Sequence, residues 1–67
     1  MIVRVRIFGR ETREVEIRRG ARIEDLLEVL GLNPEEVLVL LGGRLVTEDL
    51  VLPEGAELEV VSVVSGG

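Results

Sequence analysis

A single amphipathic helical stripe, set between segments in which apolar and charged residues alternate, constrains this chain more than any other feature. The stripe occupies residues 23–30, where the apolar side chains follow the i, i+3, i+4, i+7 spacing of one helix face: Ile23, Leu26, Leu27 and Leu30. Gly31 follows at the position where a left-handed residue commonly ends a helix. The spacing therefore predicts one helix, with one apolar face to bury.

The segments before the helix predict a pair of strands. Residues 3–7 and 14–18 alternate apolar with charged side chains, which is the period-2 pattern of half-buried strands. The intervening segment Gly9–Arg13 predicts a turn. Together these segments predict an antiparallel hairpin.

The segments after the helix predict three more strands. The unbroken apolar run 37–41 predicts a strand covered on both faces. Gly42-Gly43 is typical of a two-residue hairpin turn, which leads into a return strand over 44–46. A last alternating strand begins near Glu57.

This order of elements predicts an α+β fold of the ubiquitin-like β-grasp type. We expect a mixed sheet of four to five strands with one helix packed on one face, and the last strand parallel to the first near the sheet centre. The predicted β-grasp domain spans residues 1–64. Residues 65–67, Ser-Gly-Gly, are expected to form a flexible C-terminal tail.

Missing residue types exclude much chemistry. The 67 residues include no Cys, no His and no Lys, so thiol nucleophiles, imidazole bases and Schiff-base chemistry are excluded, and most transition-metal ligands are absent. The net charge of −5 and the single aromatic residue argue against direct nucleic-acid binding. No apolar run reaches membrane length. We therefore expect no catalytic residue, no metal site, no bound cofactor, no membrane partner and no enzymatic activity of its own.

The C-terminal residues carry the functional prediction. Fully extended, Ser65, Gly66 and Gly67 would reach roughly 10 Å beyond the folded domain. Glycine has no Cβ, so such a tail can thread a channel too narrow for side chains and present an unhindered carboxylate to a partner enzyme. The alternative is that the two glycines are only a frayed chain end.

Val61 and Val63 are the candidate docking residues. They follow Glu57 and Glu59 on the face of the last strand that is otherwise polar. Two valines there predict an exposed apolar patch beside the tail, which often marks a partner contact. The alternative is a strand end that the chain's own loops cover on both faces.

Two segments, 26–35 and 59–67, make the chain resemble a known family. The first contains Leu-Gly-Leu-Asn-Pro and the second ends in Ser-Gly-Gly, and both are similar to the ubiquitin-like sulfur carriers of the ThiS, MoaD and TtuB type. The resemblance implies that a ubiquitin-activating-type enzyme uses ATP to adenylate Gly67. Sulfur then replaces AMP to give a Gly67 thiocarboxylate, and a second enzyme accepts the sulfur.

The resemblance also implies a setting for this chemistry. We expect a cytoplasmic protein, monomeric on its own, that serves tRNA thiolation or thiamine thiazole synthesis in preference to molybdopterin synthesis.

The chain has one Asn, no Gln, no Cys and many charged residues, a composition that points to a thermophile.

Two other functions remain open from the sequence. A ubiquitin-like protein modifier would use the same adenylate to join Gly67 to lysines of target proteins. The absence of lysine prevents such a modifier from extending chains through its own side chains. A plain interaction module or an idealised design, in which the glycines have no role, is the third possibility.

Overall fold

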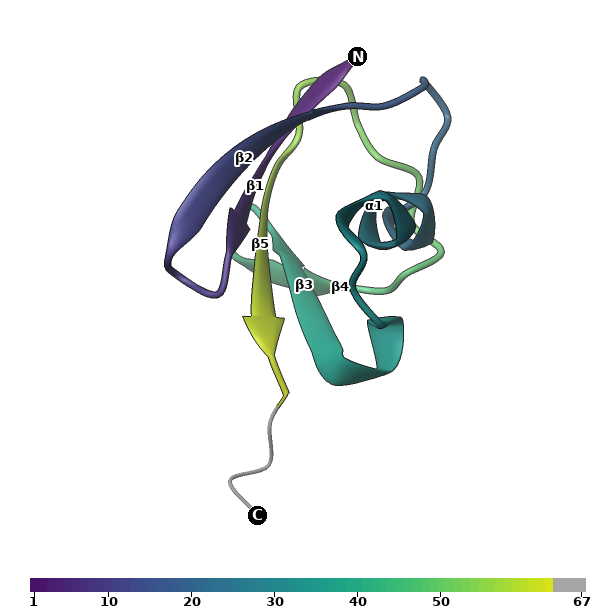
Figure 1. The fold of residues 1–67 in the computed structure, drawn as a ribbon. Coiled ribbons are helices and arrows are strands. Elements are labelled where there is room, and N and C mark those ends of the chain that lie inside the picture. The colour runs from purple at the N-terminus through teal and green to yellow at the C-terminus, as the bar shows by residue number, and fades with distance from the viewer. Residues whose placement is uncertain (64–67) are drawn as a thin grey trace.

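The computed structural model describes residues 1–63, which form a five-stranded sheet with one α-helix on one face (Figure 1). In chain order the elements are β1 (Ile2–Ile7), β2 (Glu11–Glu16), α1 (Ile23–Leu30), the 3-10 turn η1 (Pro34–Glu36), β3 (Val37–Leu41), β4 (Arg44–Val46) and β5 (Glu57–Ser62). The predicted helix and hairpins are confirmed. The turn predicted over 9–13 is shorter, because β2 already begins at Glu11.

The sheet has the strand order β2-β1-β5-β3-β4. β5 pairs in parallel with β1 and antiparallel with β3, so the last strand lies at the sheet centre. β2 and β4 form the edges, each paired antiparallel with its hairpin partner. This mixed topology confirms the predicted β-grasp.

Helix α1 begins at a residue that is a poor N-cap, and backbone groups of distant segments compensate for it. The carbonyls of Leu50 and Glu48 accept from the N–H groups of Ile23 and Glu24, at 3.0 and 2.9 Å. The Asp25 carboxylate accepts from the backbone N–H of Arg22 at 2.8 Å. Because the first helical N–H groups have no partner within a helix, these bonds replace the missing side-chain cap.

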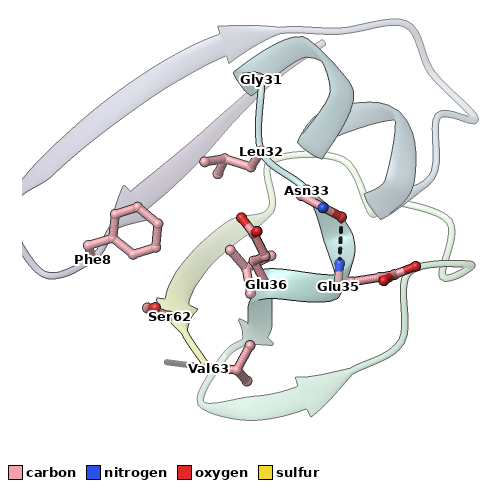
Figure 2. A pocket seen from close by; sticks show the side chains of 9 residues that line it. Phe8, Gly31, Leu32, Asn33, Glu35, Glu36, Ser62 and Val63 are labelled. Atoms are coloured by element: carbon pink, nitrogen blue, oxygen red, sulfur yellow. Dashed lines mark hydrogen bonds between the residues drawn. The ribbon is translucent and has the colours of Figure 1, made fainter. Parts of the chain in front are cut away.

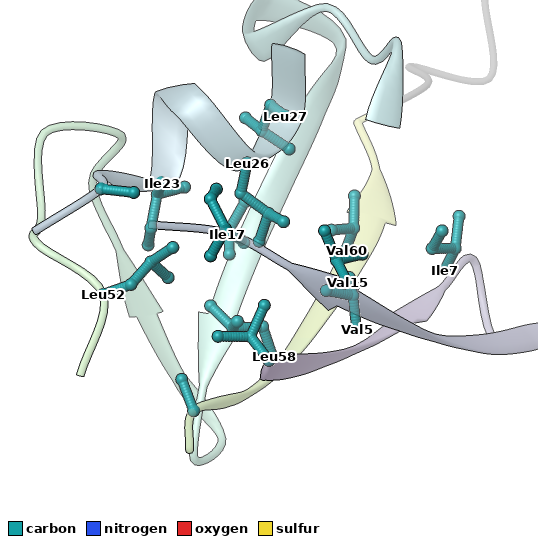
Figure 3. Close-up of a cluster of buried hydrophobic side chains, with 14 of the residues drawn as sticks. Val5, Ile7, Val15, Ile17, Ile23, Leu26, Leu27, Leu52, Leu58 and Val60 are labelled. Carbon is teal, nitrogen blue, oxygen red and sulfur yellow. The ribbon is translucent and has the colours of Figure 1, made fainter. Parts of the chain in front are cut away.

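The core lies between α1 and the inner face of the sheet (Figure 3). Its most deeply buried side chains are aliphatic: Val3, Val5, Ile23, Leu26, Leu27 and Val60. Among residues 1–63 no charged or polar side chain is buried. The fold is therefore stabilised by aliphatic packing, without a buried polar network.

The prediction that the run 37–41 is covered on both faces was wrong. Val37 and Val39 are buried, but Leu38 between them is 41% exposed. The physical reason is that the single helix covers only one face of the sheet, so every second side chain of β3 faces away from it. Among residues 1–63 no helix is long and apolar enough to cross a membrane.

We expect helix α1 to show a sharp contrast between its two faces. Leu26→Ala removes a fully buried side chain and should cost about 2–5 kcal/mol of unfolding free energy. Val29→Ala, at a site that is 61% exposed on the same helix, should change it by less than about 0.5 kcal/mol. Urea denaturation followed by circular dichroism measures both. Equal losses in the two variants would contradict the assigned core.

Candidate functional site

The candidate site lies where the chain leaves β5. We call the residues at this point, Ser62 and Val63, the tail root. Because β5 runs parallel to β1, the C-terminal ends of both strands lie at the same end of the sheet. The N–H of Phe8 donates to the carbonyl of Val60 at 2.8 Å, and the N–H of Val63 donates to the carbonyl of Glu36 at 3.1 Å. The tail root is thus held between the β1–β2 turn and η1.

The predicted tail residues Ser65, Gly66 and Gly67 lie outside the described residues, as does Val64. Their roles as the threading segment and the attachment point stay predictions. What the structure describes is the surface from which this segment departs.

Val61 belongs to an apolar patch on the sheet face opposite α1. In the sheet register Val61 lies opposite Leu38, and Leu40 lies opposite Leu45, so these side chains share one face. Leu38 and Leu45 are 41% and 62% exposed, and Leu40 and Val61 are half-buried. We call Leu38, Leu40, Leu45 and Val61 the outer patch.

Val63 has a different environment from Val61. It is 40% exposed and lines a notch of about 510 Å³ together with Phe8, residues 31–33 and 35–37, and Ser62. In Figure 2 Phe8 extends from the β1–β2 turn toward the segment after α1, and Leu32 extends from that segment toward β1. We call this the tail-root notch. The two predicted docking residues, Val61 and Val63, therefore lie on two neighbouring surfaces.

The tail-root notch carries unpaired negative charge. Glu35 and Glu36 both line it, and Figure 2 shows Glu36 extending toward Leu32. Among residues 1–63 neither carboxylate is in an ion pair. Asn33 stabilises this segment, because its side-chain oxygen accepts from the N–H of Glu35 at 2.9 Å.

Among residues 1–63, the carboxyl group with a shifted pKa is that of Asp49, which lies away from the tail root. The Thr47 hydroxyl donates to the Asp49 carboxylate and holds its pKa below the usual value, with a smaller contribution from the charge of Arg22. Both Thr47 and Asp49 belong to the connection between β4 and β5. This shift therefore reports a local turn contact and points to no reactive group at the tail root.

Sequence reasoning missed Leu38, Leu40, Leu45 and Phe8 as surface residues of the site. The first two were assigned to a strand covered on both faces. The signal that could have found them is the count of helices, because one helix cannot cover both faces of a sheet. For Phe8 the pattern gave no signal, since its side-chain direction depends on the turn backbone.

The described surface lacks several side-chain types on which metal or nucleophilic chemistry depends. Residues 1–63 contain no group of three or more His, Cys, Asp or Glu side chains that could hold a metal ion. The chain contains no Cys, His or Lys to act as a nucleophile or base near pH 7. Backbone hydrogen bonds hold the tail root in place, and apolar surface lies on both sides of it.

Comparison with known proteins decides the family. The family model for small archaeal modifier protein 2 matches residues 1–64. The chain belongs to this family. The small archaeal modifier protein 2 of Haloferax volcanii is 37% identical over 67 residues, and the matched region covers 100% of both chains. The sulfur carrier protein TtuB of Thermus thermophilus is 42% identical over 57 residues, which are 85% of this chain and 88% of TtuB.

These relatives confirm the predicted ubiquitin-like sulfur carrier family, and by name they are carriers or modifiers, not catalysts. Solved structures confirm the fold of this family member. SAMP1 of Haloferax volcanii superimposes with a TM-score of 0.77 over 100% of both chains at 21% identity. A putative molybdopterin converting factor subunit 1 of Pyrococcus furiosus gives 0.78 over 94% of this chain and 98% of its own, at 25% identity.

Proposed function

We propose that this chain is a sulfur carrier whose Gly67 carboxylate is adenylated by a ubiquitin-activating-type enzyme and converted to a thiocarboxylate. The observation that carries the proposal is the central position of β5, which is paired on both sides and so gives the residues that follow it a rigid base. The 42% identity to a protein named a sulfur carrier also supports the carrier function.

The proposed reaction assigns the bond changes to partner enzymes. The carboxylate of Gly67 attacks the α-phosphate of ATP, which forms the acyl-adenylate and releases pyrophosphate. A sulfide equivalent then attacks the acyl carbon, so that a C–S bond forms while the bond to AMP breaks. Transfer of the sulfur to an acceptor, with water supplying the oxygen, returns the carboxylate.

This chain would contribute position and accessibility to that reaction. Glycine at 66 and 67 leaves the acyl carbon free of side chains, and the tail root fixes where the segment starts. The partners would be an adenylating enzyme and a sulfur-accepting enzyme. Among acceptor pathways we favour tRNA thiolation or thiazole synthesis, and the relationship to TtuB, which is named a sulfur carrier, supports a carrier function in general.

A modifier function is the second candidate, and the family itself favours it. Both the matching family model and the Haloferax volcanii relative are named as modifiers. In that function the amine of a target lysine, in place of sulfide, would attack the Gly67 adenylate. One chain could serve both functions, because the two share the activated intermediate.

Intact-mass measurement tests the proposal. After incubation with ATP, a sulfide donor and the ubiquitin-activating-type enzyme of the host, the mass should shift by the replacement of one oxygen with sulfur. Deleting Gly67 should abolish the shift without unfolding the domain. Protein adducts without the sulfur shift would favour the modifier, and no change of mass with an active enzyme would contradict both functions.

We further propose that the outer patch docks the activating enzyme. Leu45→Asp places a charge within the patch, on the edge strand β4, at a site 62% exposed, so the fold should tolerate it. The rate of thiocarboxylate formation should fall about tenfold or more, as for loss of a residue that contributes strongly to an interface. Val63→Asp, in the neighbouring tail-root notch, tests the second predicted docking residue and should lower the rate in the same way.

Val29→Asp is the matched control for these variants. It introduces the same charge at a site 61% exposed on α1, which packs on the other face of the sheet. Activation should be unchanged in this control. Folded Leu45→Asp and Val63→Asp variants that are activated at the normal rate would refute docking through this region.

A further inference from the structure

Phe8 occupies a backbone conformation that suits a different residue. Its φ of +54° and the φ of +67° at Gly9 are both left-handed, and the N–H of Arg10 donates to the carbonyl of Ile7 at 3.0 Å. Two left-handed central residues define a type I′ turn, in which Asn or Asp before Gly is favoured. A bulky residue at the first position is strained, because its Cβ crowds the backbone.

Core packing does not explain this strain. Phe8 is the only aromatic residue of the chain and is 42% exposed. It is absent from the buried cluster that α1 and the sheet enclose. Its ring instead lines the tail-root notch, so the strained turn has a local consequence: it sets a large apolar side chain beside the tail root.

The notch has the size and chemistry of a binding site for a protein side chain. Its volume of about 510 Å³ falls within the range of ligand pockets. Phe8, Leu32 and Val63 supply apolar surface, and the carboxylate of Glu36 supplies charge without an ion-pair partner among residues 1–63. An apolar side chain next to a cationic one would complement both features.

We propose that the tail-root notch receives an apolar side chain of the activating enzyme, flanked by an Arg or Lys that pairs with Glu36. This inference rests on the proposed function. An enzyme that takes the tail into its active site must also contact the tail root, because the tail begins there. Ser62 and Val63 belong both to the tail root and to the notch lining, so the site continues the surface that the enzyme has to cover. The outer patch and the notch would then hold the chain from both sides of β5.

Phe8→Asn separates docking from stability. The substitution gives the turn its favoured Asn-Gly pair, so the melting temperature should rise or stay the same. The dissociation constant for the host's activating enzyme, measured by calorimetry without ATP on the whole chain, should increase about tenfold. Val29→Asn, at an exposed site on α1, should leave the dissociation constant unchanged.

Glu36→Arg tests the charge. It should also weaken binding about tenfold, and the remaining affinity should depend less on salt concentration. Glu28→Arg is the matched control: it makes the same change of net charge at an exposed α1 residue that is not part of the notch lining. Binding by this control should equal that of the wild type.

Several results would overturn the inference, and they are distinct from failure of the proposed function. If Phe8→Asn and Glu36→Arg bind normally while the wild type forms the thiocarboxylate, the notch has no role and the carrier function stands. A lower melting temperature for Phe8→Asn would show that the ring is structural. Self-association that Phe8→Asn abolishes would assign the notch to a second copy. Absence of any activation of the wild type would remove the proposed function itself.

Discussion

The fold depends on the insertion of β5 between β1 and β3. Val60 in this strand is fully buried, and its backbone lies between that of Ile7 on one side and Val39 on the other. The strand that completes the core is therefore also the last element among residues 1–63. Such non-local pairing is costly in loop-closure entropy, but it gives the segment that follows a rigid base. The position of the tail root is thus a consequence of core packing.

The uncovered face of the sheet is divided into a charged and an apolar part. On β1 and β5 it carries Arg4 with Glu57, while Arg4 also pairs with Glu14 of β2 at 3.2 Å. These pairs are exposed and are worth at most about 1 kcal/mol each. Toward β3 and β4 the same face becomes the outer patch. The charged part is well solvated by water. Exposure of the apolar part to water is unfavourable, so a partner that covers it would lower the free energy.

The sequence predicted the features that depend on local patterns. The helical stripe located α1, Gly31 its end, and Gly42-Gly43 the turn between β3 and β4. It did not predict that Leu38 is exposed, because an apolar run looks the same whether one or two layers cover it. It did not predict the strained Phe8 or the tail-root notch either, since these arise where the β1–β2 turn meets the segment after α1, far apart in the chain. The candidate site is therefore less predictable than the fold.

Two terminal glycines cannot by themselves distinguish one partner from another. Gly66 and Gly67 offer only backbone groups and a carboxylate, which are equally suited to sulfide or to a lysine amine as the second reactant. Selectivity between carrier and modifier chemistry must then come from surfaces that choose the enzyme. On residues 1–63 the outer patch and the tail-root notch adjoin the tail root on its two sides. The outer patch is apolar and is bordered by Glu59, which lies opposite Leu40, whereas the notch combines apolar side chains with the carboxylates of Glu35 and Glu36, neither of which is in an ion pair. Partners that use different combinations of these two surfaces could receive the same activated tail and direct it to different products.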